Sequence, residues 1–282
     1  MLIAAEVAVV AMVIYALGRG HVSFASDLRQ AEFTAAPIAP MAAGPAPHVV
    51  VDDADSLVIV SVSRDELVHV RDLTQLRGAV FSNQPYPRLA VTRTADGVRI
   101  ERPHVERLSV EIFGFSTQRI EIEVPSRSRV EIARCSGADV AGVRGGVAVH
   151  SVDGRITLTD LQGSIDAHSD DGRIVLQNVT AGSMLADTND GRIEASGLSF
   201  SGDATLRTGD GSMWLRLAPN ANVTIDASTS DGSISVDGSS FHGDDSAHRT
   251  VTVGTGTSRV KLTTGDGSIH IFTNGETHDN GL

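Results

Sequence analysis

The stretch "TNDGRIEAS", residues 188–196, is one of six closely similar segments in a chain of 282 residues. The other copies are "SVDGRITLT" at 151–159, "SDDGRIVLQ" at 169–177, "TGDGSMWLR" at 208–216, "TSDGSISVD" at 229–237 and "TGDGSIHIF" at 264–272. Each copy reads Ser or Thr, any residue, Asp, Gly, Arg or Ser, and then Ile or Met. A segment repeated this often serves either chemistry or architecture, and its spacing and patterning separate the two.

An Asp-Gly pair at the centre of each copy predicts a turn. The Asp side chain bonds to nearby backbone and Gly tolerates positive φ, so we expect positive φ at Gly172 and Gly191. The pairs are Asp153 and Gly154, Asp171 and Gly172, Asp190 and Gly191, Asp210 and Gly211, Asp231 and Gly232, and Asp266 and Gly267. Successive aspartates are 18, 19, 20, 21 and 35 residues apart, so the last interval holds an insertion or a degenerate copy.

Apolar and polar residues alternate on both sides of each turn, which predicts strands with one buried face. Three apolar columns recur at fixed distances from the turn. They are Ile156, Ile174, Ile193, Met213, Ile234 and Ile269; Leu158, Leu176, Ala195, Leu215, Val236 and Ile271; and Val149, Ala167, Ala186, Leu206, Ala227 and Leu262. A repeat this short cannot bury its apolar face alone and must stack on its neighbours, which predicts an all-β solenoid.

An antiparallel meander, in which each Asp-Gly pair closes a hairpin, is the competing topology, and alternation alone does not exclude it. A weaker half-repeat recurs at the same phase between copies, as in "LQGSI" at 161–165 and "TAGSM" at 180–184. The first residues of the copies also form a hydroxyl column, which is Ser151, Ser169, Thr188, Thr208, Thr229 and Thr264. Both features favour the solenoid.

The charge of the chain is concentrated in the repeats. Residues 145–282 carry 18 acidic and 8 basic residues and so hold about −10 of the net charge of −12. Such a surface argues against a nucleic-acid partner, because phosphate binding needs clustered Lys and Arg. Cys135 is the single cysteine, which excludes an internal disulfide and a cysteine-rich metal site, and a buried inert thiol is expected.

The N-terminal region predicts export. Residues 2–17 are apolar except for Glu6, which predicts one short apolar helix before the solenoid, and residues 1–25 are expected to be a signal peptide or a membrane anchor. Arg19 follows this run with no positive charge before it, a pattern that favours the opposite orientation. An Ala/Pro-rich spacer is predicted over 26–48, a single β-strand-repeat domain over 49–275 and a polar tail over 276–282.

The strand "IEIEVP" at 120–125, the following "VEIARCSGADVAGV", the repeated turns and the final "RVKLTTGDGSIHI" together resemble the bacterial putative-adhesin family of β-strand-repeat domains. The likeness extends over about residues 49–272. It implies an exported, often membrane-anchored, right-handed parallel β-helix-like domain. It implies no reaction and provides no catalytic residues.

Three kinds of chemistry fit the repeats poorly. Calcium-binding β-rolls need tandem glycines in a strict nine-residue period, which "GDGSI" lacks. The segment 166–177 resembles an EF-hand loop but has Asp171 where the loop needs Gly and Gln177 where it needs Glu. Glycan cleavage needs two carboxylates about 5–9 Å apart in distinct environments, and six equivalent turn aspartates are better explained as turn formers.

One outward column is a weak candidate for a metal site. His150, His168 and Asp187 lie three residues before successive turn aspartates and are expected to stack on consecutive rungs. Two imidazoles and a carboxylate are competent zinc or iron ligands, but an exposed column also tolerates any polar residue, and this second interpretation is favoured. No catalytic residue, cofactor or established metal site is predicted.

The sequence therefore predicts a non-catalytic, exported scaffold or binding surface of the cell envelope. Its expected partner is an envelope protein or a glycan, with membrane contact through the N-terminal segment if that segment is not cleaved. An accessory or sensor component of an envelope-stress system and a glycan-active β-helix enzyme are the alternatives. A groove lined by aromatic side chains would favour glycan binding, although aromatic residues make up only 4% of the chain.

Overall fold

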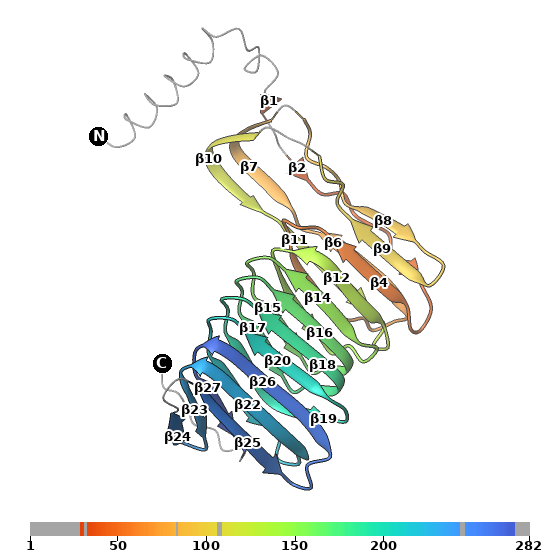
Figure 1. The fold of residues 1–282 in the computed structure, drawn as a ribbon. Coiled ribbons are helices and arrows are strands. Elements are labelled where there is room, and N and C mark those ends of the chain that lie inside the picture. Colours follow the sequence, from red (N-terminus) through yellow and green to blue (C-terminus); the bar gives the residue numbers. More distant parts are fainter. Residues whose placement is uncertain (1–28, 31–32, 83, 106–108, 243–245, 274–282) are drawn as a thin grey trace, which may run out of the picture. The chain divides into compact units, whose positions relative to one another are not determined.

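The computed structural model describes residues 29–30, 33–82, 84–105, 109–242 and 246–273, which form strands and turns without a helix (Figure 1). Within these residues nothing meets the length and apolarity of a membrane-spanning helix. The predicted N-terminal segment 1–25 and the polar tail 276–282 lie outside the described residues. The all-β prediction is confirmed for the part of the chain that the structure describes.

The chain divides into two compact units, each described by itself. The smaller unit comprises residues 1–36, 73–88 and 103–117, and the larger comprises 37–72, 89–102 and 118–282. Two segments of the smaller unit, 73–88 and 103–117, fall within the range 49–275 that is predicted to be a single domain. These two segments interrupt the larger unit and pair with each other instead of with its strands.

The smaller unit is an antiparallel sheet. Strand β7 (Gln75–Ser82) pairs with β10 (Ser109–Thr117), and the short strands β1 (Arg29–Gln30) and β2 (Phe33–Thr34) also pair with β7. Phe33, Leu76 and Tyr86 form its small core, with 4.8 Å between the ring centroids of Phe33 and Tyr86. Phe33 lies in the predicted Ala/Pro spacer, so part of that segment is strand with a buried apolar side chain.

The larger unit consists of two long sheets that face each other, named here from their positions in Figure 1. The front sheet runs in the order β8 (Ala90–Arg93), β9 (Gly97–Glu101), β4 (His48–Asp52), β12 (Arg129–Cys135), β14 (Val147–Ser151), β16 (Gln162–Ser169), β18 (Thr180–Thr188), β20 (Ala204–Thr208), β26 (Ser258–Asp266), β22 (Val223–Asp231) and β25 (Ala247–Val253).

The back sheet runs in the order β3 (Met41–Ala42), β6 (Leu67–Asp72), β11 (Arg119–Val124), β5 (Leu57–Val62), β13 (Gly137–Ala141), β15 (Ile156–Thr159), β17 (Ile174–Gln177), β19 (Ile193–Phe200), β21 (Met213–Leu217), β27 (Ile269–Phe272), β23 (Ser233–Val236) and β24 (Ser239–His242).

Each repeat forms one rung, which is a front strand, an Asp-Gly turn and a back strand. Neighbouring rungs pair in parallel, as in β14 with β16 and β15 with β17, so the turns do not close hairpins. The solenoid prediction is therefore confirmed and the antiparallel meander is excluded for the repeats. The right-handed sense of the coil stays a prediction.

The rungs do not stack in the order of the sequence. The sixth copy lies between the fourth copy and the fifth. In the front sheet β26 of the sixth copy pairs with β20 of the fourth and β22 of the fifth, and in the back sheet β27 pairs with β21 and β23. The long interval before the sixth copy is an insertion that contains β24 and β25, which pair antiparallel with the fifth copy. Antiparallel strands thus cover this end of both sheets, as terminal repeats of solenoids must.

The core lies between the two sheets and is built from the predicted columns. Ile156, Ile174 and Ile193 are in register on successive back strands, and Ile269 lies between Met213 and Ile234. In the first and third columns no side chain is more than 4% exposed, whereas in the second Val236 is only half-buried. Cys135 is buried as predicted, and this burial raises the pKa of its thiol.

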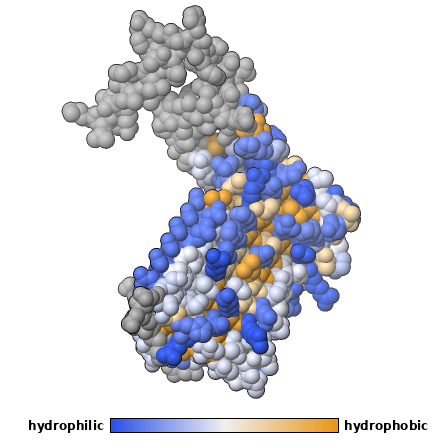
Figure 2. Space-filling model, viewed as in Figure 1, coloured by the Kyte–Doolittle hydropathy of each residue, from blue (hydrophilic) through white to orange (hydrophobic). Residues whose placement is uncertain are grey.

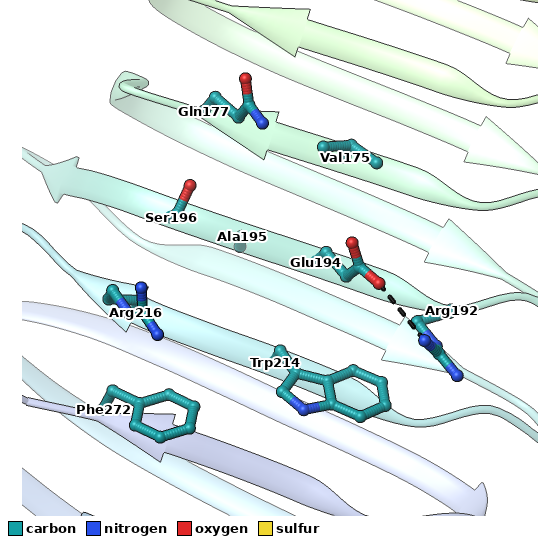
Figure 3. Close-up of a pocket in the computed structure, with 9 residues that line it drawn as sticks. All are labelled: Val175, Gln177, Arg192, Glu194, Ala195, Ser196, Trp214, Arg216 and Phe272. Atoms are coloured by element: carbon teal, nitrogen blue, oxygen red, sulfur yellow. Dashed lines mark hydrogen bonds and ion pairs between the residues drawn. The ribbon is translucent and has the colours of Figure 1, made fainter. Parts of the chain in front are cut away.

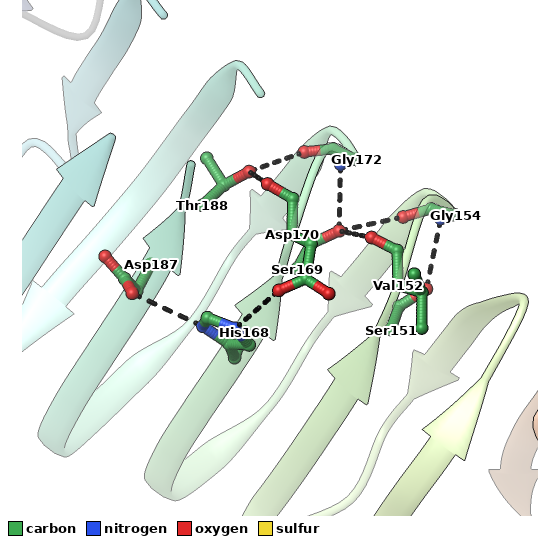
Figure 4. A network of polar contacts seen from close by, with 9 residues as sticks. All are labelled: Ser151, Val152, Gly154, His168, Ser169, Asp170, Gly172, Asp187 and Thr188. Carbon is green, nitrogen blue, oxygen red and sulfur yellow. Dashed lines mark hydrogen bonds and ion pairs between the residues drawn. The ribbon is translucent and has the colours of Figure 1, made fainter. Parts of the chain in front are cut away.

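The hydroxyl column lies inside the turn edge and joins the rungs (Figure 4). The Ser169 Oγ accepts a hydrogen bond from the Gly172 nitrogen at 2.9 Å within its own turn. The Thr188 Oγ1 donates to the Gly172 carbonyl oxygen of the preceding rung at 3.1 Å, and Thr208 donates likewise to Gly191 at 2.8 Å. Each buried hydroxyl therefore satisfies backbone polar groups that stacking removes from water.

The turn glycines are needed for close stacking, which corrects the sequence-based reason. Of the six, only Gly232 has a positive φ, of 150°, and Gly172 and Gly191 do not. A Cβ on Gly172 would overlap the carbonyl oxygen of Gly154, and a Cβ on Gly191 would overlap that of Gly172. The backbones of successive turns approach so closely that no side chain fits between them.

Candidate functional site

The described surface of the larger unit is mainly polar and carries few exposed large apolar side chains. On the face shown in Figure 2, hydrophilic residues cover much of the larger unit and hydrophobic residues lie between them. The described large apolar side chains that are exposed, Val62, Leu73, Val152 and Leu185, are scattered along the chain. The outward positions of the repeats are therefore the candidates for a site.

Outward side chains differ from rung to rung on the back sheet. In register on successive strands lie Val175, Glu194, Trp214 and His270, with Gln177, Ser196, Arg216 and Phe272 two residues further on. The inward neighbours on the same strands keep the apolar columns. Because side chains alternate along a strand, the side chains that recur from rung to rung face inward and those that differ from rung to rung face outward.

The outward residues form a groove of about 460 Å³ across β17, β19, β21 and β27 (Figure 3). Glu194 lies on its floor between two arginines, with 3.5 Å from its Oε1 to Arg192 Nη1 and 3.7 Å to Arg173 Nη1. Gln177 and Ser196 add an amide and a hydroxyl group. The groove therefore offers hydrogen-bond donors and acceptors together with positive charge.

The aromatic side chains of the groove are stacked along the solenoid. The Trp214 and His270 rings are 5.1 Å apart between centroids with an interplanar angle of 21°. The Arg192 guanidinium carbon lies 4.4 Å from the Trp214 ring centroid. Both neighbours stabilise Trp214 by stacking and cation–π attraction, and they leave mainly its ring edge for a ligand.

Arg216 is the cation of the groove without a carboxylate partner among the described residues. Its guanidinium carbon lies 5.2 Å from the Phe272 ring centroid, and its buried Nε donates no hydrogen bond to the described part of the chain. Phe272 lies in register with it on β27, and Trp214 precedes it by two residues on β21. An arginine whose guanidinium is packed on an aromatic ring and has no carboxylate partner can donate its hydrogen bonds to an anionic group.

His270 lies at the edge of the same group of side chains. Partial burial lowers the pKa of its imidazole, because the charged form loses hydration there. The ring therefore stays neutral near pH 7 and stacks on Trp214 without adding charge to the groove. Sequence reasoning missed this site because Trp214 and His270 come from the fourth and sixth copies, which only the interleaved rung order makes adjacent.

The turn aspartates do not form a site together. Asp153, Asp171, Asp190, Asp210, Asp231 and Asp266 are all exposed along the turn edge. Among the described residues that line the groove, Glu194 is the only carboxylate, so the groove does not present the carboxylate pair that glycan cleavage needs. The interpretation of these aspartates as turn formers stays a prediction.

The predicted histidine column lies on the opposite, front sheet. His150 pairs in register with His168, and His168 with Asp187, so the three residues stand on consecutive rungs as expected. The structure adds Asp170, a turn residue beside His168 that the sequence analysis did not single out. The signal for it was its position two residues after His168, just before the turn Asp-Gly pair.

Residues 136–272 match the family model described as Toastrack DUF4097. This segment is similar to Toastrack domains. The match spans the repeats and the rungs that carry both candidate sites, and it confirms the resemblance to an uncharacterised β-rich family. No curated protein matches the chain.

Two solved structures share a distant likeness with the chain. One is described as a putative cell adhesion protein from Clostridium sporogenes, with 10% identity, a TM-score of 0.37, and 86% of this chain and 99% of that chain covered. The other is described as a putative adhesin from Bacteroides fragilis, with 12% identity, a TM-score of 0.38, and 86% and 96% covered. Scores this low carry no argument about function.

Proposed function

We propose that the chain is a non-catalytic, adhesin-like binding protein of the cell envelope whose back-sheet groove binds an acidic glycan. The observation that carries this proposal is Arg216, a guanidinium that packs on Phe272 beside Trp214 and has no carboxylate partner among the described residues. A carboxylate of the ligand would supply that partner.

A uronic acid polymer matches the groove in chemistry. Its carboxylates suit the fork of donors on Arg216, and its hydroxyl groups suit the Gln177 amide and the Ser196 hydroxyl. Because Arg192 and His270 cover the faces of Trp214, a sugar ring would contact the edge of the indole instead of stacking on it. The groove crosses several rungs, as binding to an extended polymer requires.

The binding experiment compares two outward arginines. Calorimetry with an oligogalacturonate of defined length is expected to show binding by the full chain, with affinity at least roughly tenfold lower for Arg216→Ala, because a charge-assisted hydrogen bond is lost. Arg207→Ala on the front sheet is the matched control and should bind like the wild type. A neutral maltooligosaccharide should not bind.

Two results would overturn the glycan proposal. One is the absence of binding to the acidic oligomer, and the other is binding that Arg216→Ala and Arg207→Ala weaken equally. The non-catalytic part is tested separately by incubating the same oligomer with the protein and measuring chain length. We expect no shortening, and a shortened product would support the glycan-active enzyme instead.

The proposed envelope location rests on the apolar run 2–17 and the Ala/Pro-rich sequence after it. Cells that express the full chain are converted to spheroplasts and treated with protease. An exported domain should be digested or released, whereas protection inside intact spheroplasts would support the opposite orientation that Arg19 suggests.

A further inference from the structure

His150, His168 and Asp170 form a compact group of metal-ligating side chains on the front sheet, far in sequence from the residues of the groove. One ligand atom from each residue can be chosen so that all three lie within 4.8 Å of one another. His150 is on β14, His168 is on β16 and Asp170 begins the turn after β16. Two neutral imidazoles and a carboxylate are a donor set that zinc accepts.

The two imidazoles already meet at an angle instead of lying parallel. Their centroids are 4.7 Å apart and their planes make an angle of 84°. His150 is exposed and His168 is half-buried, so a rotation of the His150 side chain brings its nitrogen closer without disturbing the core.

Asp187 lies on the expected rung but contacts His168 in a way that suits a positioning residue better than a metal ligand. Its Oδ2 lies 3.3 Å from His168 Nδ1, while His168 Nε2 lies 3.2 Å from Asp170 Oδ1 (Figure 4). A carboxylate on Nδ1 fixes the tautomer and ring orientation of a metal-binding histidine and raises its basicity. Asp187 therefore orients His168, and Asp170 takes the ligand position predicted for Asp187.

The backbone of Asp170 is held firmly by the neighbouring rungs. Its nitrogen donates to the Val152 carbonyl oxygen at 3.0 Å, and its own carbonyl oxygen accepts a hydrogen bond from Thr188 at 3.3 Å. Among the described residues, no lysine or arginine makes an ion pair with Asp170 or Asp187. The site thus has a fixed carboxylate and an excess of negative charge.

We propose that His150, His168 and Asp170 bind one zinc ion, with Asp187 as the positioning residue and the fourth coordination position open to solvent. Tetrahedral zinc with bonds of about 2.0–2.1 Å places its ligand atoms about 3.3 Å apart. The distance from His168 Nε2 to Asp170 Oδ1 already meets this value. The His150 side chain then has to rotate so that one of its nitrogens comes equally close to the other two ligand atoms.

Zinc titration by calorimetry on the full chain tests this proposal. We expect one site of micromolar affinity, which His150→Ala and His168→Ala each remove and which Asp187→Asn weakens roughly 10–100-fold. His248→Ala is the matched control, because His248 pairs with Asp226 as an exposed His–Asp pair for which no third ligand is found among the described residues. It should leave zinc binding unchanged.

Cobalt substitution supplies a readout that a merely structural role would not change. The wild type should give the visible absorption of tetrahedral cobalt, Asp187→Asn should shift that spectrum, and Asp187→Glu should restore it in part. The absence of zinc binding would overturn the proposal, as would binding that survives both histidine substitutions or is lost equally in His248→Ala. Circular dichroism of each variant shows whether the β fold is retained, and His150→Gln replaces His150→Ala if it is not.

Discussion

At the turn edge of the solenoid, six rungs carry the same kind of hydroxyl and the same glycine, whereas on the outer face of the back sheet the rungs carry different side chains. The inner pattern is set by recurring contacts, which are the stacked apolar columns and, from Ser169 onward, the hydroxyl bond to a glycine carbonyl. The outer pattern is free of those contacts, and there Trp214, Arg216 and Phe272 form a groove. Repetition thus marks architecture, and departure from it marks the candidate sites.

The sharpest contrast between inside and outside concerns two adjacent aspartates. Asp53 is buried with Arg102, whose Nε lies 2.7 Å from Asp53 Oδ2 and whose Nη2 lies 3.1 Å from Asp72 Oδ2. Asp52 is partly exposed and pairs with the exposed Arg134 at 2.8 Å. Arg102 thus bridges two buried carboxylates, whereas Arg134 binds one partly exposed carboxylate through both its Nε and its Nη2. The two arginines differ in their access to water and in the number of carboxylates that they pair.

Arg102→Ala is expected to lower the free energy of unfolding by about 3–5 kcal/mol, because two buried carboxylates lose the positive charge that they share. Arg134→Ala should lower it by less than about 1 kcal/mol, since solvent screens the exposed pair. Urea denaturation of both variants measures the difference. Equal losses would contradict the distinction between buried and exposed charges.

The glycine ladder gives the next largest effect. Gly191→Ala is expected to cost about 2–3 kcal/mol, because its Cβ would overlap the backbone of the preceding turn and the rungs must separate. Gly182→Ala is the control, since the atoms nearest to its Cβ would lie 3.9 Å away and its φ is not positive. Urea denaturation should find the control nearly neutral. A neutral Gly191→Ala would contradict close stacking.

A smaller effect is expected for the hydroxyl column. Thr208→Val keeps the shape of the side chain but removes the donor to the Gly191 carbonyl oxygen at 2.8 Å, which should cost about 1 kcal/mol. Thr205→Val, on the same strand but facing outward, should change stability much less. Thermal unfolding of the pair measures the contrast, and equal shifts would show that the inner hydroxyls only fill space.

The smallest expected effect is a change in the pH dependence of folding stability, which comes from His270 at the edge of the groove. The pKa of His270 is lowered in the folded protein by burial, so the unfolded chain binds its proton more readily. Folding stability should therefore be complete above the unfolded pKa, near 6.5, and fall as pH drops towards the folded pKa. His270→Gln should remove a small part of the acid sensitivity seen in urea denaturation. An unchanged pH profile would contradict the burial of the imidazole.

Much of the fold is predictable because one strand period fixes which side chains face inward. The columns through Ile156, Val149 and Ser151 follow from alternation and turn spacing alone, and so does the burial of Cys135. The reason for the glycines was not predictable, because close approach depends on how the rungs stack. The partition into two units and the buried position of Arg102 depend on contacts between distant segments.

The candidate sites show the limit of repeat patterns most clearly. Inner strands that are nearly identical fit several rung orders equally well, so the pattern does not specify that the sixth copy lies next to the fourth. The groove depends on that order, since it places His270 beside Trp214 and Phe272 beside Arg216. The histidine column was predictable because its rungs are consecutive, but the angle of the rings and the part played by Asp170 were not.

Rung order is the central claim, and methyl NOE spectroscopy on the folded protein tests it most directly. Side chains in register on adjacent rungs are about 5 Å apart, and those two rungs apart are about 10 Å apart. The structure predicts cross-peaks between the methyl groups of Met213 and Ile269 and between those of Ile269 and Ile234. A direct Met213–Ile234 cross-peak without Met213–Ile269 would show stacking in sequence order and would contradict both the fold of this end and the groove.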